Sequence, residues 1–267
     1  MYYKYVLPQK SIDEVREDVE AWGEQQRREI EALKNNEAFR KEFLQNLSHE
    51  FKTPVFAIQG YIDTLLQGAM QDPPTNERFL QKASKNVERL VNLIQDLDEI
   101  SKLERGELTL HNENFVVQEL VREVFESLSI NAEQRKIQFG IKKGCEQPLV
   151  VFADKEKIRQ VIINLVDNAI KYGKEGGSIT ASMYNTDGKN ILVEISDDGL
   201  GISEENLARI FERFYRTPEG RSRDVTGSGL GLAICKHIIE AHWHSMHVRS
   251  TEDVGTTIGF TLRAKKE

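Results

Sequence analysis

One apolar stripe constrains the N-terminal part of this chain more than any other feature of its sequence. Apolar side chains recur every three or four positions, at Phe39, Phe43, Leu47, Phe51, Val55, Ile58, Ile62 and Leu65. This spacing places them along one face of an α-helix. Successive residues of a helix turn by about 100°, so His49 lies about 160° from both Leu47 and Phe51. We therefore predict that the His49 imidazole points away from the stripe.

Polar and helix-breaking residues surround His49 on the predicted helix. Glu50 is adjacent, Thr53 follows one turn later on the same side, and Pro54 costs about 3 kcal/mol inside a helix. A zinc-binding His-Glu-x-x-His pair is excluded because Thr53 stands where the second histidine belongs. Two interpretations remain. His49 is either an ordinary exposed histidine or a nucleophile whose neighbouring carboxylate orients it.

The segment around His49 resembles the phosphoacceptor box of sensor histidine kinases, with the sequence Ser48-His49-Glu50-Phe51-Lys52-Thr53-Pro54. The resemblance implies that His49 attacks the γ-phosphoryl group of ATP. It also implies that Glu50 hydrogen-bonds the far ring nitrogen and that Thr53 orients water for a phosphatase reaction. The phosphoryl group would pass to an aspartate of a response-regulator receiver domain.

The composition of the chain further limits the classes of protein to which it can belong. The chain has 267 residues, enough for one to two domains, and its formal net charge of −7 gives no reason to expect a nucleic-acid partner. Two cysteines without metal-type spacing fit a reducing compartment. No apolar run approaches the ~20 residues of a membrane span. Because of the resemblance, we expect this chain to be the cytoplasmic portion of an inner-membrane protein that carries an upstream membrane sensor.

The N-terminal helices are predicted as a leader and a hairpin. Residues 12–22 follow a coiled-coil seam that slips before Ile30, which favours a signalling helix over residues 1–39, although a solvated charged helix is the alternative. The helix that carries His49 should end near Gly68, and a second helix should begin near Thr75 or Asn76 and stop at Gly106.

These two helices predict a dimer. Residues 40–106 would form an antiparallel hairpin whose stripes are too long for one partner to cover. Two hairpins from two copies would then form an all-α four-helix bundle, so we expect a homodimer.

Residues 107–267 are predicted to form an α+β two-layer sandwich that serves as the catalytic ATP-binding domain. A helix is expected over residues 116–134, and another should follow its cap at Asp154. Short strands are expected at residues 107–110, 137–141, 149–152, 179–184, 191–195, 246–250 and 256–262.

A polar face follows Asp154. Asn164, Asn168, Lys171 and Tyr172 lie within one to two turns of one another, opposite an apolar stripe. Asparagines satisfied by the core are the structural alternative to a ligand site. The segment resembles the N box of the kinase family. This implies that Asn168, with Asn164 nearby, holds Mg²⁺ or orients its waters, that Lys171 meets phosphate and that Tyr172 packs near adenine.

The glycine-rich segments complete the predicted nucleotide site. The segment at residues 196–202 resembles the G1 box, which implies that Asp197 accepts from the adenine amino group and that Gly199 and Gly201 allow close backbone approach. Residues 211–216 resemble the F box, ending in a phosphate-reaching Arg216, and residues 217–226 would form a mobile lid. The last glycine segment opens a helix that could cradle phosphate, through Gly227, Gly229, Leu230 and Gly231.

Two rival functions fit parts of the pattern. An ATPase of the gyrase and MutL type would use a carboxylate where Asn164 stands, and it would lack the outward His49 helix. A non-catalytic dimeric scaffold would not need His49, Asn168 and Asp197 together. The sequence departs from the family at the His-Gly-Gly turn, where it has His242-Trp243-His244, and a metal cluster with His237 and His247 is a minor alternative.

Overall fold

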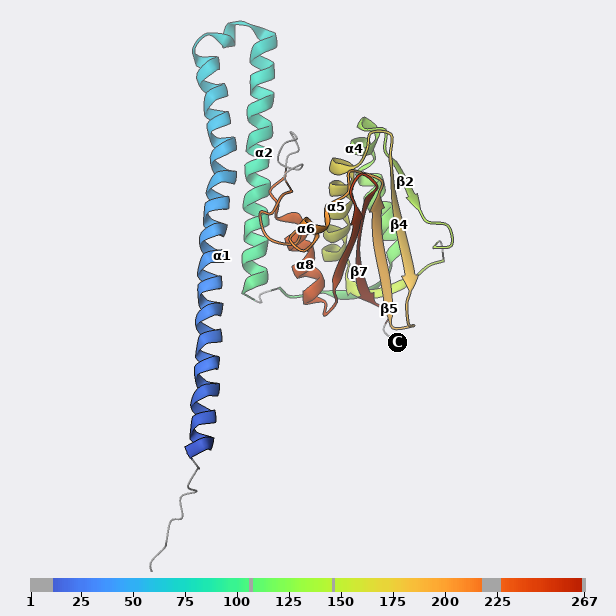
Figure 1. Cartoon of the computed structure of the whole chain (residues 1–267). Coiled ribbons are helices and arrows are strands. Elements are labelled where there is room, and N and C mark those ends of the chain that lie inside the picture. The colour runs from blue at the N-terminus through green and yellow to red at the C-terminus, as the bar shows by residue number, and fades with distance from the viewer. Residues whose placement is uncertain (1–11, 106–107, 146, 218–226, 266–267) are drawn as a thin grey trace, which may run out of the picture. The chain divides into compact units, whose positions relative to one another are not determined.

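The structure is a computed structural model that describes residues 12–105, 108–145, 147–217 and 227–265 (Figure 1). The side chains at positions 12–15, 32, 35, 36, 39, 40 and 104 are outside the description. The chain divides into two compact units, Met1–Thr53 and Pro54–Glu267. The side chains of the predicted seam residues Ile12 and Val15 and of the stripe residue Phe39 are therefore not described. The predicted stop at Gly106 and most of the predicted lid lie outside the described residues.

The long helix and its hairpin form as the sequence predicts. Helix α1 spans Ile12–Leu66 and continues through Pro54. The short 3₁₀ helix η1 (Ala69–Gln71) follows, and α2 spans Pro73–Glu104. The predicted start of α2 at Thr75 or Asn76 is wrong, because prolines are tolerated in the first turn of a helix. The cap residue is Asp72, and its carboxylate accepts a hydrogen bond from the Thr75 hydroxyl.

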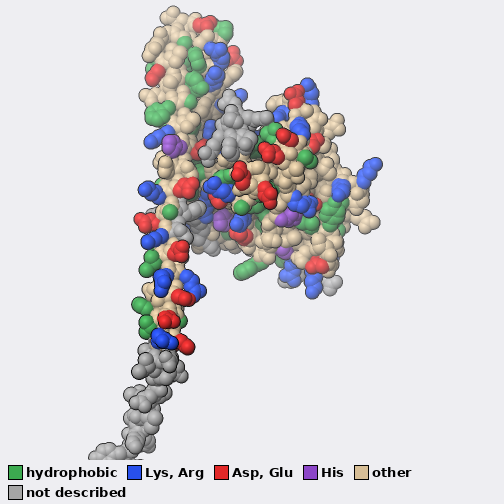
Figure 2. All heavy atoms as spheres, in the orientation of Figure 1, with side chains coloured by type: hydrophobic (Ala, Val, Ile, Leu, Met, Phe, Trp, Pro, Cys, Tyr) green, Lys and Arg blue, Asp and Glu red, His purple; other side chains and the backbone are tan. Residues whose placement is uncertain are grey.

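Several apolar side chains of the two hairpin helices remain at the surface of this single chain. Phe56 and Leu66 of α1 and Leu80 of α2 are more than half exposed. Figure 2 shows hydrophobic side chains on the visible face of the hairpin helices, with acidic and basic side chains interspersed over the rest of the visible surface. Among the described residues, no helix combines the length and the apolar character that a membrane span requires.

The C-terminal part of the chain contains a mixed five-stranded sheet in the order β2-β4-β5-β7-β6. Its strands are β2 (Gln138–Ile141), β4 (Ser178–Asn185), β5 (Asn190–Asp197), β6 (Met246–Thr251) and β7 (Gly255–Arg263). Only the β2–β4 pair is parallel. A separate antiparallel pair joins β1 (Asn112–Val116) to β3 (Val150–Asp154).

Helices cover one side of the sheet (Figure 1). They are α3 (Val117–Ser127), α4 (Ser129–Gln134), α5 (Lys155–Tyr172), α6 (Glu204–Leu207) and α8 (Gly231–Ala241). The core between the layers contains Ile158 and Ile162 of α5, Val193 of β5 and Phe260 of β7, all fully buried. This arrangement confirms the predicted helical hairpin followed by an α+β sandwich.

Two local predictions are wrong. Residues 108–110 are not a strand, and the strand forms instead at Asn112–Val116, where pairing with β3 buries Phe115. The helix expected over residues 116–134 breaks at Leu128. Ser127 and Ser129 flank the break, and each donates its hydroxyl to a carbonyl three residues earlier, a local bond that competes with continued helix.

Candidate functional site

The His49 turn lies in the unit Met1–Thr53 and presents an exposed imidazole. Glu50 beside it is half-buried, and the Thr53 hydroxyl donates to the His49 carbonyl at 3.1 Å. Pro54 has no N–H to offer the carbonyl of Glu50. The single hydroxyl proton of Thr53 is therefore donated to the backbone. Only the lone pairs of the Thr53 hydroxyl oxygen can interact with another group beside the imidazole.

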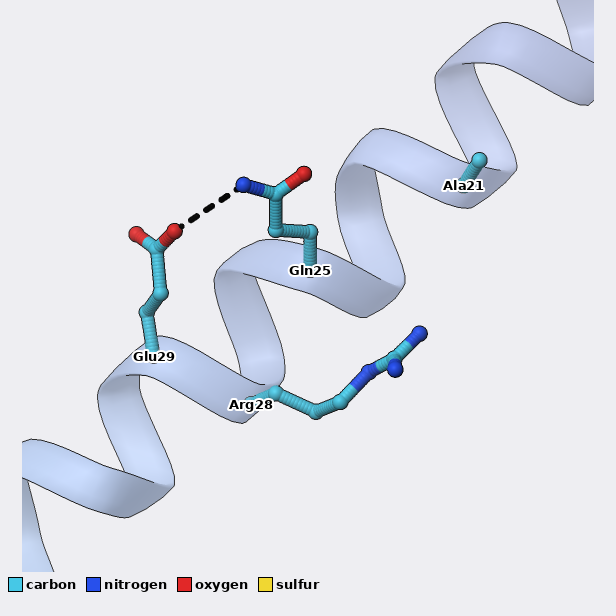
Figure 3. A pocket seen from close by; sticks show the side chains of 4 residues that line it. All are labelled: Ala21, Gln25, Arg28 and Glu29. Carbon is cyan, nitrogen blue, oxygen red and sulfur yellow. Dashed lines mark hydrogen bonds between the residues drawn. The ribbon is translucent and has the colours of Figure 1, made fainter. Parts of the chain in front are cut away.

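A shallow hollow earlier on α1 carries no comparable chemistry. Figure 3 shows that its side chains all come from one helix, and that Gln25 donates to the Glu29 carboxylate at 3.1 Å. Ala21 and Arg28 complete it. A surface formed by a single helix encloses no ligand, so we assign no site there.

The predicted N-box residues do share one face of α5. The helix begins at Asp154, whose carboxylate accepts from the Lys157 N–H at 3.1 Å, as predicted for a cap. The opposite apolar positions are buried, whereas Asn164, Asn168, Lys171 and Tyr172 are half-exposed.

Two of these polar side chains have partners within the protein. The Lys171 ammonium contacts the Asp167 carboxylate at 2.6 Å. Asn164 hydrogen-bonds the thiol of Cys235, whose own S–H faces the Val161 carbonyl at 3.8 Å. Burial raises the pKa of the Cys235 thiol to about 12, so this thiol stays neutral and the asparagine amide keeps a fixed neighbour. Amide oxygens are suitable ligands for a hard cation, so the pair Asn164 and Asn168 fits Mg²⁺.

The end of strand β5 approaches the end of α5. The Gly199 N–H donates to Asp197 Oδ1 at 2.9 Å, and a side chain on Gly199 would lie 2.5 Å from the Tyr172 carbonyl oxygen. Glycine is therefore required here by close backbone approach. Burial raises the pKa of Asp197, against the opposing effect of the backbone N–H groups of Gly199 and Thr256. The turn continues to Gly201, which has a φ of 69°.

A second glycine turn leads into α8. Gly229 has a φ of 71°, and a side chain there would lie 2.8 Å from the backbone of Phe214, whose N–H donates to the Gly229 carbonyl at 2.9 Å. Arg216 donates to the Gly227 carbonyl at 3.4 Å. The side chain of Leu230 is fully buried, so only its backbone can face a ligand. Gly231 begins α8, and a side chain at this position would point toward the Asn164 amide.

The residues predicted for a nucleotide site thus come from three converging segments of one unit, while His49 belongs to the other unit. Three supporting features were not predicted from the sequence. The Arg135 guanidinium donates to the carbonyls of Ile170, Lys171 and Gly173, which caps the C-terminus of α5. Gly255 allows the backbone to approach Asp197 closely, since a side chain at position 255 would lie 2.1 Å from the Asp197 carbonyl oxygen.

His242 provides the third supporting feature. Its Nε2 accepts from the Asp154 N–H at 3.0 Å, and its Nδ1 lies 2.8 Å from the Ile238 carbonyl and donates to it. The ring therefore links the end of α8 to the cap of α5, and it does so as a neutral imidazole. A protonated ring would present N–H to the N–H of Asp154. Burial lowers the pKa of His242 below its ordinary value.

This bond predicts a pH-dependent stability. When the pKa of a histidine is lower in the folded state than in the unfolded state, the histidine costs no stability at pH values above its unfolded-state pKa. Stability is lost as the pH falls below about 6.5. The variant His242→Asn, which cannot be protonated, should lose less stability than the wild type between pH 7.5 and 5.5. At pH 7.5 it should be less stable by about 1–2 kcal/mol, because the Asp154 N–H loses its acceptor. Urea unfolding at both pH values measures this difference, and parallel curves would contradict the assignment.

The histidines of this region are engaged separately. His244 contacts the Thr261 hydroxyl at 3.1 Å, His247 the Glu194 carboxylate at 3.2 Å, and His237 the Arg213 guanidinium at 3.1 Å. Within the ranges that the structure covers, no group of three or more His, Cys, Asp or Glu side chains is placed to hold a metal. Trp243 takes the glycine-like conformation of the missing turn, with a φ of 64°.

Comparison with known proteins matches two family models to this chain. Residues 39–106 match the family model "His Kinase A (phospho-acceptor) domain", and residues 153–266 match "Histidine kinase-, DNA gyrase B-, and HSP90-like ATPase". Sensor histidine kinase WalK of Bacillus subtilis is 34% identical over 229 residues, which cover 85% of this chain and 37% of that protein. Sensor-like histidine kinase SenX3 of Mycobacterium tuberculosis is 35% identical over 85% of this chain and 55% of its own length.

Solved structures are similar as well. Histidine kinase AdeS of Acinetobacter baumannii matches with a TM-score of 0.65 and 25% identity over 82% of this chain and 98% of that chain. Histidine kinase ThkA, in a complex with response regulator protein TrrA, matches with a TM-score of 0.68 and 27% identity over 84% of this chain and 61% of that one. A phosphoacceptor hairpin joined to an ATP-binding α+β domain defines a class of signalling enzyme. This chain belongs to the sensor histidine kinase family of two-component systems.

The chain is shorter than the curated relatives that it matches. It spans 37% of WalK, 55% of SenX3 and 62% of the kinase SasA of Microcystis aeruginosa.

Proposed function

We propose that this chain is the core of a protein-histidine kinase that phosphorylates His49 from ATP. The observation that carries the proposal is the exposed His49 imidazole in a chain that also carries a complete nucleotide-site pattern, with Asn168 on α5, Asp197 after β5 and the glycine turn before α8. The domain limits that we propose are 1–39 for the signalling helix, 40–106 for the hairpin and 107–267 for the catalytic domain.

The chemistry at His49 is an in-line displacement. The unprotonated ring nitrogen donates its lone pair to the γ-phosphorus, and the bond between that phosphorus and the bridging oxygen breaks. ADP leaves with the electron pair. Glu50 accepts a hydrogen bond from the other ring N–H and stabilises the cationic ring. A protonated imidazole has no lone pair for this attack, so acid inhibits the reaction.

The nucleotide would be held by residues of the other unit. Asp197 accepts from the adenine amino group and Tyr172 packs beside the base, while Gly199 and Gly201 admit it. Lys171 and Arg216 attract phosphate oxygens, and the N–H groups of Gly227, Gly229, Leu230 and Gly231 donate to them. Asn168 and Asn164 would hold Mg²⁺, which neutralises phosphate charge when bound.

The partners follow from the hairpin and the phosphoryl group. Exposed apolar side chains lie along α1 and α2, including Val55, Ile62, Val87 and Ile94. They support a homodimer in which two hairpins form a four-helix bundle. A response-regulator receiver aspartate would accept the phosphoryl group from His49. The ThkA structure contains its response regulator, which supports such a partner here. We place the chain on the cytoplasmic side of an inner membrane, below a membrane sensor.

Incubation with γ-³²P-ATP tests the proposal against its rivals. A histidine kinase retains label that is lost in acid and kept in base, because a phosphorus–nitrogen bond is acid-labile. A gyrase-type ATPase would release labelled phosphate and retain none. A scaffold would bind nucleotide and do neither. Absence of retained label with bound ATP would reject the kinase assignment.

Thr53 separates two activities of the same turn. Phosphotransfer to and from His49 needs no hydroxyl, but regulator dephosphorylation needs a water held in line, which the Thr53 lone pairs can position. Thr53→Ala should keep most autophosphorylation and slow regulator dephosphorylation by about tenfold or more, the ~1.4 kcal/mol of one lost positioning bond.

The control for this prediction is Glu50→Ala, which should show the opposite pattern because it removes the group that orients the imidazole. Decay of separately phosphorylated regulator is the measurement. Unchanged decay with Thr53→Ala would leave this hydroxyl as a local partner of the His49 carbonyl only.

A further inference from the structure

Helix α2 contacts the ATP-binding domain through two acidic side chains. The Glu99 carboxylate accepts from the Lys157 ammonium at 2.6 Å and also from the Gln160 amide, both on α5. This ion pair is well covered, with exposed side-chain fractions of 28% for Lys157 and 16% for Glu99. Ile100, the next residue of α2, is 1% exposed. The contact is therefore a packed interface.

The second acidic residue reaches the glycine turn that precedes α8. Asp96 Oδ2 accepts from the Ser228 hydroxyl at 3.0 Å, and the same hydroxyl oxygen accepts from the Leu230 N–H at 3.2 Å. Ser228 lies between Gly227 and Gly229. Its single proton is thus committed to Asp96, while its oxygen is committed to the turn.

The charges around Asp96 resemble those that a phosphate would meet. The positive charge of Lys171 acts on Asp96 and lowers its pKa, although burial has the larger effect and raises it, and Glu99 also raises it. Asp96 therefore brings an anion to a serine of the glycine turn and toward the lysine of the N box. The proposed function assigns phosphate oxygens to this lysine and to backbone N–H groups of the same turn.

We propose that Asp96 competes with the phosphates of ATP, so that docking of α2 and binding of the nucleotide oppose each other. The inference rests on the proposed nucleotide site. One hydroxyl proton cannot serve the carboxylate and a phosphate at once, and two anions beside each other repel. Because coupling between two equilibria is reciprocal, docked α2 weakens ATP binding and ATP loosens α2 to the same extent. Glu99 holds the docked state without contacting the glycine turn.

Neutralising Asp96 is the direct test. In the full chain, Asp96→Asn should bind a non-hydrolysable ATP analogue at least about fivefold more tightly, the lower end of typical coupling between sites. Adenosine has no phosphates to compete, so its affinity should change less. Isothermal titration with Mg²⁺ present measures both ligands. Equal affinity of the variant and the wild type for the ATP analogue would overturn the proposal.

A matched control lies on the same helix. Asp98→Asn removes the same charge, but Asp98 pairs with Lys102 of its own helix at 2.7 Å, and its side chain is 59% exposed. It should leave both affinities unchanged. Equal tightening by both variants would mean that net charge alone is responsible, and this would also overturn the proposal.

Crosslinking measures the reciprocal effect. Glu99→Cys combined with Gln160→Cys places two thiols at the docked contact, while the native Cys145 and Cys235 are buried. In a glutathione redox buffer, whose oxidised form takes up the two electrons, the ATP analogue should lower the equilibrium fraction of this disulfide relative to the dithiol at least about fivefold, because coupling between two equilibria is reciprocal. An unchanged ratio of disulfide to dithiol, with the analogue bound, would reject the coupling. Failure of the wild type and of Asp96→Asn to bind any ATP analogue would instead reject the proposed nucleotide site.

Discussion

Replacing His49 by glutamine is expected to abolish the acid-labile phosphoprotein. Glutamine is a polar side chain of similar length, but its amide nitrogen has no lone pair available for attack on phosphorus. The exposed position of His49 means that the substitution removes no core contact. Labelling with γ-³²P-ATP should fall below detection. The affinity for the nucleotide should change less than about twofold, because all residues assigned to ATP lie in the other compact unit.

A matched substitution tests whether this loss is specific. His111→Gln changes another exposed histidine, one whose backbone N–H rather than its ring contacts Asp154. It should retain normal labelling. Label retained on His49→Gln would identify a different nucleophile. Equal loss of ATP binding by His49→Gln would show that phosphoacceptor and nucleotide site are not independent.

Most of the predictions from the sequence rested on the local periodicity of residue types within single helices and strands. The helical spacing of Asn164, Asn168 and Lys171 was enough to place them on one face of α5, and the structure has them there. Strand β5 was predicted over residues 191–195, and the structure has it at Asn190–Asp197, with Ile191 and Val193 buried. In both cases the information lies within one element, where geometry is fixed by the backbone.

Contacts between distant segments could not be predicted in this way. The bond from the Asp154 N–H to His242 joins residues 88 positions apart, and the bond between Asp96 and Ser228 joins residues 132 apart. No periodicity relates such pairs, because they depend on how the elements pack. The misplaced strand at residues 107–110 has the same origin, since register with β3 rather than local propensity decides where β1 forms.

Asn168→Asp should have the second large effect, on the phosphates and the metal together. Asn168 is half-exposed on the polar face of α5, one turn from Asn164, and aspartate has nearly the same shape. The substitution therefore tests charge rather than packing. A carboxylate at this position repels the triphosphate and changes how Mg²⁺ is coordinated. The rate of His49 phosphorylation should fall by about a hundredfold or more, equivalent to ~2.7 kcal/mol.

Two other substitutions give this prediction its specificity. Asn114→Asp adds the same charge at an exposed position of β1 and should leave the rate unchanged. Asp197→Asn should instead weaken discrimination between ATP and GTP, because an amide can present a donor where the adenine amino group needs an acceptor. Initial rates of labelling measured against Mg²⁺ and against each nucleotide separate the two effects. If Asn168→Asp and Asp197→Asn both turn over ATP normally, the nucleotide does not bind where α5, the end of β5 and the start of α8 meet.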